Sequence, residues 1–94
     1  MSAGQVWRRR DGLRWVEVQA DTVEPSGWRL MVPVVDLVEA PEAPPLVITV
    51  GRQRARVHLL TTAPVDELGA IDGELGVAEV EDLRDAIRAL IGLP

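Results

Sequence analysis

Alternating apolar and polar residues between positions 13 and 36 constrain the fold of this chain more than any other feature. Residues 13–20 alternate with a period of two, which predicts a strand with one apolar face and one more polar face. A Pro25-Ser26-Gly27 turn follows, and residues 30–35 form a second, nearly continuous apolar strand. A β-rich domain is therefore expected. The side chains that share the first face are Arg14, Val16, Val18 and Ala20.

Two residues in these strands carry structural requirements of their own. Arg14 stands at the end of an otherwise apolar row, where a guanidinium needs a partner or a pocket. Pro33 lacks the backbone N–H that a strand ladder uses, so a bulge or a free edge is expected at that point.

The remaining chain predicts further strands, a loop and two helical segments. The clearest is a helix with one apolar stripe, acids in its first turns and arginines late. This stripe is expected to pack on the sheet, and it also offers a dimer or partner surface. The predicted elements are a strand at 4–9, a loop at 37–45, a hairpin of strands 46–50 and 56–60 about residues 51–54, a helical turn at 65–68 and the helix at 77–90.

Composition bounds the class of protein. The 94 residues have an ordinary globular composition and predict a single domain, residues 1–94. Without cysteine the chain has no disulfide, no thiol nucleophile and no thiolate metal site. No signal peptide is visible, nor any apolar run near the roughly 20 residues that span a bilayer, so a cytoplasmic protein is expected. No spacing of acids or glycines points to a metal or a cofactor, and none is expected.

Charge is distributed unevenly along the chain, whose formal net charge is −5. Residues 1–60 hold eight arginines against seven acids, and residues 61–94 hold two arginines against eight acids. An acidic whole argues against tight, non-specific binding of nucleic acid, because phosphate neutralisation dominates such affinity. A local basic face on the N-terminal part remains compatible with this balance.

Several segments form a series that is similar to a known family. In chain order they are Val16-Glu17-Val18-Gln19-Ala20-Asp21, Arg29-Leu30-Met31-Val32-Pro33, Val57-His58-Leu59-Leu60-Thr61-Thr62 and Glu81-Asp82-Leu83-Arg84-Asp85-Ala86-Ile87. This series resembles CcdB, a toxin of bacterial type II toxin–antitoxin systems. The opening Gly4-Gln5-Val6-Trp7 and the closing Leu90-Ile91-Gly92-Leu93 are more similar to the related toxin MazF (PemK).

Resemblance to the CcdB/MazF superfamily implies a small α+β, β-rich fold. The implied architecture is a partly open SH3-like β-barrel, or twisted antiparallel sheet, with a C-terminal α-helix. It also implies a homodimer that is regulated by a cognate antitoxin. The two branches differ in their target, which is DNA gyrase for CcdB and single-stranded RNA for MazF.

The MazF branch implies an endoribonuclease. Such enzymes use an arginine at the start of one strand and a threonine or serine at the end of the next. Arg14 matches the arginine, and a fixed guanidinium suits the stabilisation of charge on a phosphorane. Val35 stands at the place of the hydroxyl, and a valine neither donates a hydrogen bond nor moves a proton. His58 alternates with apolar residues and is expected to be a packed or rim residue rather than a base.

The CcdB branch implies a poison that binds gyrase and catalyses nothing. It binds through a C-terminal Trp-Gly-Ile, whose tryptophan ring attracts an arginine of the target. Ile91, Gly92 and Leu93 stand at this place and, with Arg88, form the predicted partner-binding surface. Because the CcdB-like pattern is the longer one, gyrase poisoning is the main functional prediction. RNA cleavage that depends on Arg14 is the alternative, and a non-toxic relative that only dimerises and binds a partner is the third.

Arginines at positions 52, 54 and 56 alternate, so all three can line one face of a strand. A solvated strand edge that discourages aggregation explains such a row. The alternative interpretation is that Arg52, Arg54 and Arg56 contact RNA or the acidic tail of an antitoxin.

Overall fold

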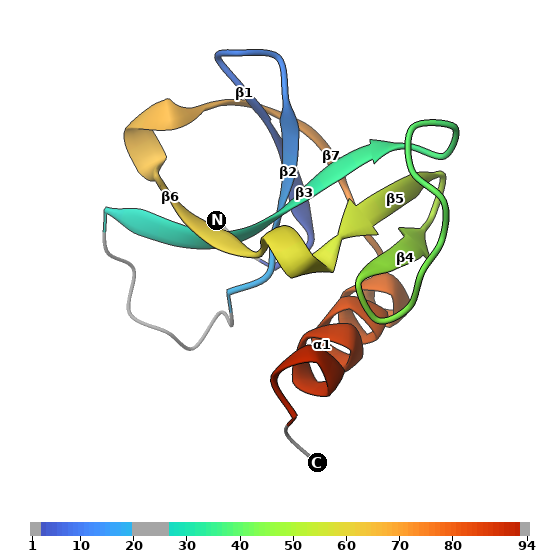
Figure 1. Cartoon of the computed structure of the whole chain (residues 1–94). Coiled ribbons are helices and arrows are strands. Elements are labelled where there is room, and N and C mark those ends of the chain that lie inside the picture. Colours follow the sequence, from blue (N-terminus) through green and yellow to red (C-terminus); the bar gives the residue numbers. More distant parts are fainter. Residues whose placement is uncertain (1–2, 20–26, 93–94) are drawn as a thin grey trace.

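One antiparallel sheet of seven strands and one C-terminal helix make up the computed structural model, which describes residues 3–19 and 27–92. The sheet curls but stays open, and the helix lies against one of its faces (Figure 1). The expected α+β, β-rich fold class is confirmed. In chain order the elements are β1 (Gln5–Arg9), β2 (Arg14–Glu17), β3 (Trp28–Asp36), β4 (Val47–Val50), β5 (Gln53–Arg56), η1 (Val57–Leu59), β6 (Thr61–Pro64), η2 (Val65–Glu67), β7 (Leu68–Glu74) and α1 (Val77–Ile91).

Strand β3 organises the sheet because it pairs with three other strands, within the order β4-β5-β3-β2-β1-β7. Along one side it pairs with β2, from Arg14↔Val34 to Glu17↔Met31. Along the other side its first four residues pair with β6 and its last three pair with β5. Pro33 lies between these two partners, so the free edge expected at this proline is confirmed.

The larger core lies between the sheet and α1. Val16 and Val32 are paired across β2 and β3, and both are fully buried in this core. Leu83, from the middle of the helical stripe, is 0% exposed against them, which confirms that the stripe packs on the sheet. The helix ends at Ile91 and is capped by Gly92, which adopts a left-handed conformation (φ 76°) as expected for a helix stop. Within the described residues no helix has the length and apolarity needed to cross a membrane.

The opposite face of the sheet is also covered, which its more polar pattern did not predict. Here Trp15 and Met31 pack with residues of β6 and β7, because these two strands curl over this face. The curl buries two charged residues as well, Glu17 (3% exposed) and Arg29 (8% exposed). At its rim, the Arg9 guanidinium lies 5.1 Å from the centre of the Trp15 ring, a cation–π contact.

The predicted strand over residues 56–60 is wrong. Gly51 has φ +61°, so the chain reverses at residues 51–52 and β5 begins at Gln53 and ends at Arg56. Val34 of β3 pairs with Ala55 of β5, and Met31 of β3 pairs with Thr61 of β6. Two residues of β3 lie between these two pairs, whereas five residues, 56–60, lie between their partners. Five extended residues do not fit a gap of two. The chain therefore forms the 3-10 turn η1 before β6 begins, because such a turn spans less distance per residue than a strand.

Truncation of Leu83 tests the packing of α1 on the sheet. Leu83→Ala removes a fully buried side chain and is expected to lower the free energy of unfolding by about 2–5 kcal/mol. Val77→Ala, on the same helix but 83% exposed, is expected to change it by less than about 0.5 kcal/mol. Denaturant unfolding of both variants measures the difference. Equal values would mean that α1 does not hold the core.

Candidate functional site

Three polar residues continue the apolar face of the sheet beyond the edge of the core. Arg14 is paired with Val34, two residues before Asp36, and Asp36 is paired with Gln53. Because paired residues and residues two apart share a face, the side chains of Arg14, Asp36 and Gln53 lie on the face that carries Val34. We call these three residues the Arg14 cluster. They meet where β2 and β5 begin and β3 ends.

The guanidinium of Arg14 is held from two directions. Its Nη2 donates to Asp36 Oδ1 at 2.8 Å. With the Gln53 carboxamide turned so that its oxygen faces the guanidinium, that oxygen accepts from both terminal nitrogens of Arg14. The Arg14 side chain is 25% exposed and that of Asp36 is 65% exposed, so the pair contributes roughly 0–1 kcal/mol to stability. The contacts orient the guanidinium more than they stabilise the fold.

Arg14 and Asp36 lie between two hollows in the surface and line both of them. The first hollow, about 460 Å³, is bounded by the β4–β5 turn, the end of β7 and the start of α1. The second, about 390 Å³, is bounded by the β1–β2 turn and the end of β3. An extended ligand that occupies both hollows would therefore cross the Arg14–Asp36 pair.

Acids outnumber bases around the first hollow. Asp72, Glu74 and Glu79 line it together with Asp36, against Arg14 and Arg52. Asp72 is neutralised by Arg8, whose Nη2 lies 2.7 Å from Asp72 Oδ2. Across residues 3–19 and 27–92, no group of three or more histidine and acidic side chains is placed to hold a metal ion. The positive charge that lines this hollow therefore comes from two arginines, Arg14 and Arg52, within an acidic surround.

Val35 lies on the other face of β3 from the Arg14 cluster. It is paired with Arg54 and alternates with Val34 and Asp36, and it borders the second hollow. The residue at the end of β3 that does reach Arg14 is the next one, Asp36. Thr61 and Thr62 lie on β6 and line neither hollow.

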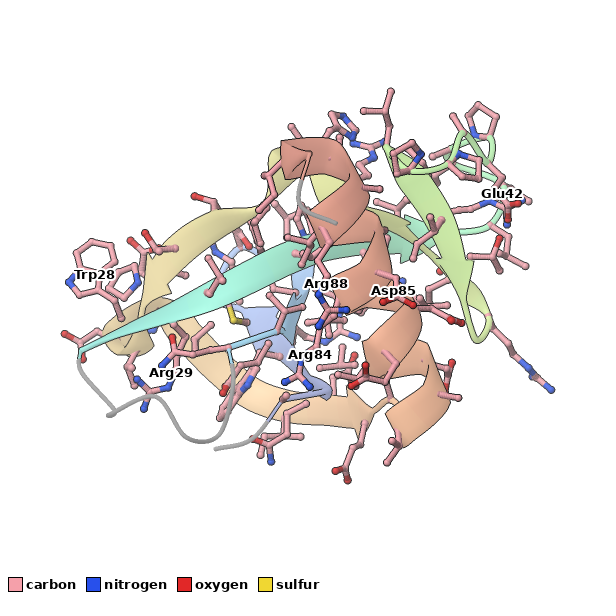
Figure 2. The ribbon with its side chains drawn as sticks, turned by 90° about the horizontal axis from the view of Figure 1, so that it is seen from below. Trp28, Arg29, Glu42, Arg84, Asp85 and Arg88 are labelled. Carbon is pink, nitrogen blue, oxygen red and sulfur yellow. The ribbon has the colours of Figure 1, made fainter. Side chains whose placement is uncertain are left out.

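The three alternating arginines do not act as one row. Arg52 is exposed in the β4–β5 turn and lines the first hollow near Arg14. Arg54 holds the 37–45 loop, because its Nε donates to the Ala40 carbonyl at 3.0 Å, its Nη1 bonds Thr49 Oγ1, and Glu42 lies 3.6 Å away. Figure 2 shows Glu42 on this loop, at the far end of the molecule from Trp28. Arg56 is half-buried at the end of β5, paired with Val47.

The predicted partner-binding residues lie at the end of α1, apart from the Arg14 cluster. Ile91 is exposed and, with Leu90, borders an apolar groove of about 230 Å³ against η1. Arg88 is exposed and paired with Asp85 at 2.7 Å, and both lie along α1 (Figure 2). Gly92 is the helix cap, and Leu93 lies outside the described residues. His58 is a rim residue of the same groove, with Nδ1 3.1 Å from the Leu46 carbonyl oxygen.

Sequence reasoning identified Arg14 and its need for a partner, but it missed Asp36 and Gln53. The period of two places Asp36 on the face of Val34, which was readable from the sequence. What was not readable is the register that sets Arg14 opposite Val34 and Gln53 opposite Asp36. Register depends on which strands pair, and residues 14, 36 and 53 are far apart in the chain.

Two solved structures share this fold over the whole chain. An endoribonuclease from Mycobacterial species superposes with a TM-score of 0.86 at 21% sequence identity, over 100% of this chain and 93% of its own. An endoribonuclease in complex with its cognate antitoxin, also from Mycobacterial species, superposes with a TM-score of 0.85 at 21% identity, over 100% of this chain and 97% of its own. No protein-family model matches the chain, and no curated protein sequence matches it either.

Arg54→Ala tests whether Arg54, unlike Arg52, holds the 37–45 loop. Loss of its bonds to Ala40 and Thr49 leaves partly buried acceptors unsatisfied, so the free energy of unfolding is expected to fall by about 1–3 kcal/mol. Proteolysis within residues 37–45 is expected to become faster. Arg52→Ala, in the exposed turn, is expected to change stability by less than about 0.5 kcal/mol. If the two variants were equally stable, Arg54 would not anchor the loop.

Proposed function

We propose that this chain is the toxin of a type II toxin–antitoxin pair and that it cleaves single-stranded RNA through Arg14. The observation that carries the proposal is the position of Arg14, oriented by two side chains between two hollows of one surface. Similarity of fold to endoribonucleases over the whole chain supports it.

Arg14 suits the chemistry that RNA cleavage requires. When the 2′-hydroxyl of RNA attacks the adjacent phosphorus, negative charge develops on the phosphorane oxygens. A guanidinium offers five N–H donors in a rigid fork, so its bonds to Asp36 and Gln53 leave donors for a phosphate. Because the Arg14 cluster fixes the fork in advance, little reorganisation is needed when the charge appears. Arg52, at the rim of the first hollow, is the second arginine proposed to contact the RNA backbone.

Gyrase poisoning is the less supported mechanism. It would act through the end of the chain, where Ile91 takes the place of an aromatic residue and offers no ring face to a cation. The two similar solved structures reported above are described as endoribonucleases. The balance of observations therefore favours RNA as the target and reverses the order expected from the sequence.

Two partners belong to this proposal. A cognate antitoxin is expected, since one of the similar structures is an endoribonuclease bound to its antitoxin. A homodimer is expected because a 94-residue domain gains core by pairing, and the apolar groove beside Leu90 and Ile91 is exposed on this chain. Arg56 and Arg88 are further proposed contacts for a partner.

Arg14→Ala tests the enzymatic mechanism. The variant is expected to lose RNA cleavage by a factor of about 10²–10³ because one charge-stabilising donor is lost. It is expected to stay folded because the Arg14–Asp36 pair is partly exposed and contributes little to stability. Arg84→Ala is the matched control, since Arg84 is similarly exposed and also pairs with an acid, Glu81, but lies on α1 away from the hollows. Cleavage of bacterial RNA by the purified proteins measures both.

Induction of the intact chain in cells separates the three functions. Fragmented RNA supports the endoribonuclease, whereas covalent gyrase–DNA complexes with intact RNA would support the gyrase poison instead. If growth continued and neither signal appeared, the chain would be a non-toxic relative. Cells that express Arg14→Ala and still arrest with fragmented RNA would contradict the role given to this arginine.

A further inference from the structure

The structure places a carboxylate where the expected hydroxyl is missing. Val35 occupies the position of the hydroxyl and faces away from Arg14, whereas Asp36 shares the face of Arg14 and contacts it at 2.8 Å. Only Oδ1 of Asp36 takes part in this contact. Its second oxygen, Oδ2, makes no hydrogen bond within the described part of the chain, and the side chain is 65% exposed at the junction of the two hollows.

Position distinguishes this ion pair from the others on the surface. Arg88–Asp85, at 2.7 Å, is about as short, but it is an i,i+3 pair along α1 and borders neither of the hollows beside the Arg14 cluster. Arg14–Asp36 joins the start of β2 to the end of β3 and lines both hollows. Moreover, Gln53 also accepts from Arg14, so the guanidinium stays oriented when the Asp36 carboxylate turns toward a ligand.

We propose that Asp36 is a catalytic residue, the proton acceptor for the RNA 2′-hydroxyl. This inference rests on the proposed endoribonuclease function. It adds a base that the resemblance to the MazF branch did not indicate. It makes the pair Arg14 and Asp36 the counterpart of an arginine and a hydroxyl residue, with the base one position later in the strand.

The step balances without any further reactant. Asp36, ionised, takes the proton from the 2′-hydroxyl, and the 2′-oxygen forms a bond to the adjacent phosphorus. The bond from phosphorus to the 5′-oxygen breaks, and that oxygen takes a proton from water, which reaches the open hollows. The products are a 2′,3′-cyclic phosphate and a 5′-hydroxyl, and Asp36 returns its proton to the solvent. Arg14 donates to the phosphorane oxygens throughout.

Asp36 is not the only charged group at the two hollows. Arg14 from β2, Arg8 from β1 and Arg52 from the β4–β5 turn line them, and so do the carboxyl groups of Glu39, Asp72, Glu74 and Glu79. The pH dependence of cleavage therefore reports on Asp36 only by comparison with a variant that lacks its carboxyl group.

Asp36→Asn provides this comparison. It preserves the size of the side chain and one acceptor oxygen for Arg14 but accepts no proton, so single-turnover cleavage of bacterial RNA at neutral pH is expected to fall by about 10²–10⁴-fold. The intact chain is expected to lose activity as the pH is lowered and Asp36 becomes protonated, and Asp36→Asn is expected to lack this fall. Asp85→Asn is the matched control, since Asp85 is 70% exposed and paired with an arginine at 2.7 Å.

The outcomes separate this inference from the function on which it rests. If Asp36→Asn cleaves RNA as fast as the control, Asp36 is not the base. If it cleaves slowly but keeps the pH profile of the intact chain, Asp36 only positions Arg14. Either result would overturn the inference. Cleavage by the intact chain would then still support the proposed function. No cleavage by the intact chain overturns both. Asp36→Glu, which keeps the base, is expected to restore part of the rate and its pH dependence, even if Asp36→Asn proves poorly folded.

Discussion

Burial of strand β3 on both faces is the constraint on which the structure depends. Met31 and Val32 are adjacent in sequence, point to opposite sides of the sheet, and are both fully buried. A shift of one residue in the pairing of β3 would exchange the two sets of side chains between two cores of different shape. The register with β2 is therefore strongly specified, and the same register brings Asp36 beside Arg14.

The Arg14 cluster gains its geometry from this pairing and little from its own energy. Its ion pair is partly exposed, and pairs of this kind contribute little to stability. The buried valines behind it hold β2, β3 and β5 in place, so three polar side chains at the strand ends converge at no cost in core packing. A site of this kind tolerates change in its polar residues as long as the register survives.

Acidity of the chain as a whole sets a second condition on function. With a net charge of −5 and acids around the first hollow, long-range attraction of RNA is weak. Under the proposed function, an RNA substrate would be bound by short-range contacts with Arg14, Arg52 and the walls of the two hollows, and selected by shape and local hydrogen bonds and not by total charge.

Much of the fold was predictable because its signals are local. The strand alternation over residues 13–20, the apolar run at 30–35 and the stripe of the last helix each depend on neighbours in sequence. The structure has β2 over Arg14–Glu17 within the first segment, β3 over the second and α1 over the third, and Ala20 lies outside the described residues. The prediction over residues 56–60 failed because η1 forms between two strands, β5 and β6, that both pair with β3. No local pattern encodes such pairing, and the β-branched and apolar residues there are equally suited to a strand.

The sequence alone determined that Arg14 ends an apolar row and so requires a partner, because the period of a strand assigns each residue to a face. It also determined that Val35 brings no hydroxyl to the site. Only the tertiary structure decided that the partner is Asp36, that Gln53 assists it, and that Arg54 is used to hold a loop. The physical reason is that strand register and loop docking follow from contacts between residues distant in the chain, and these form only when both faces of β3 are covered.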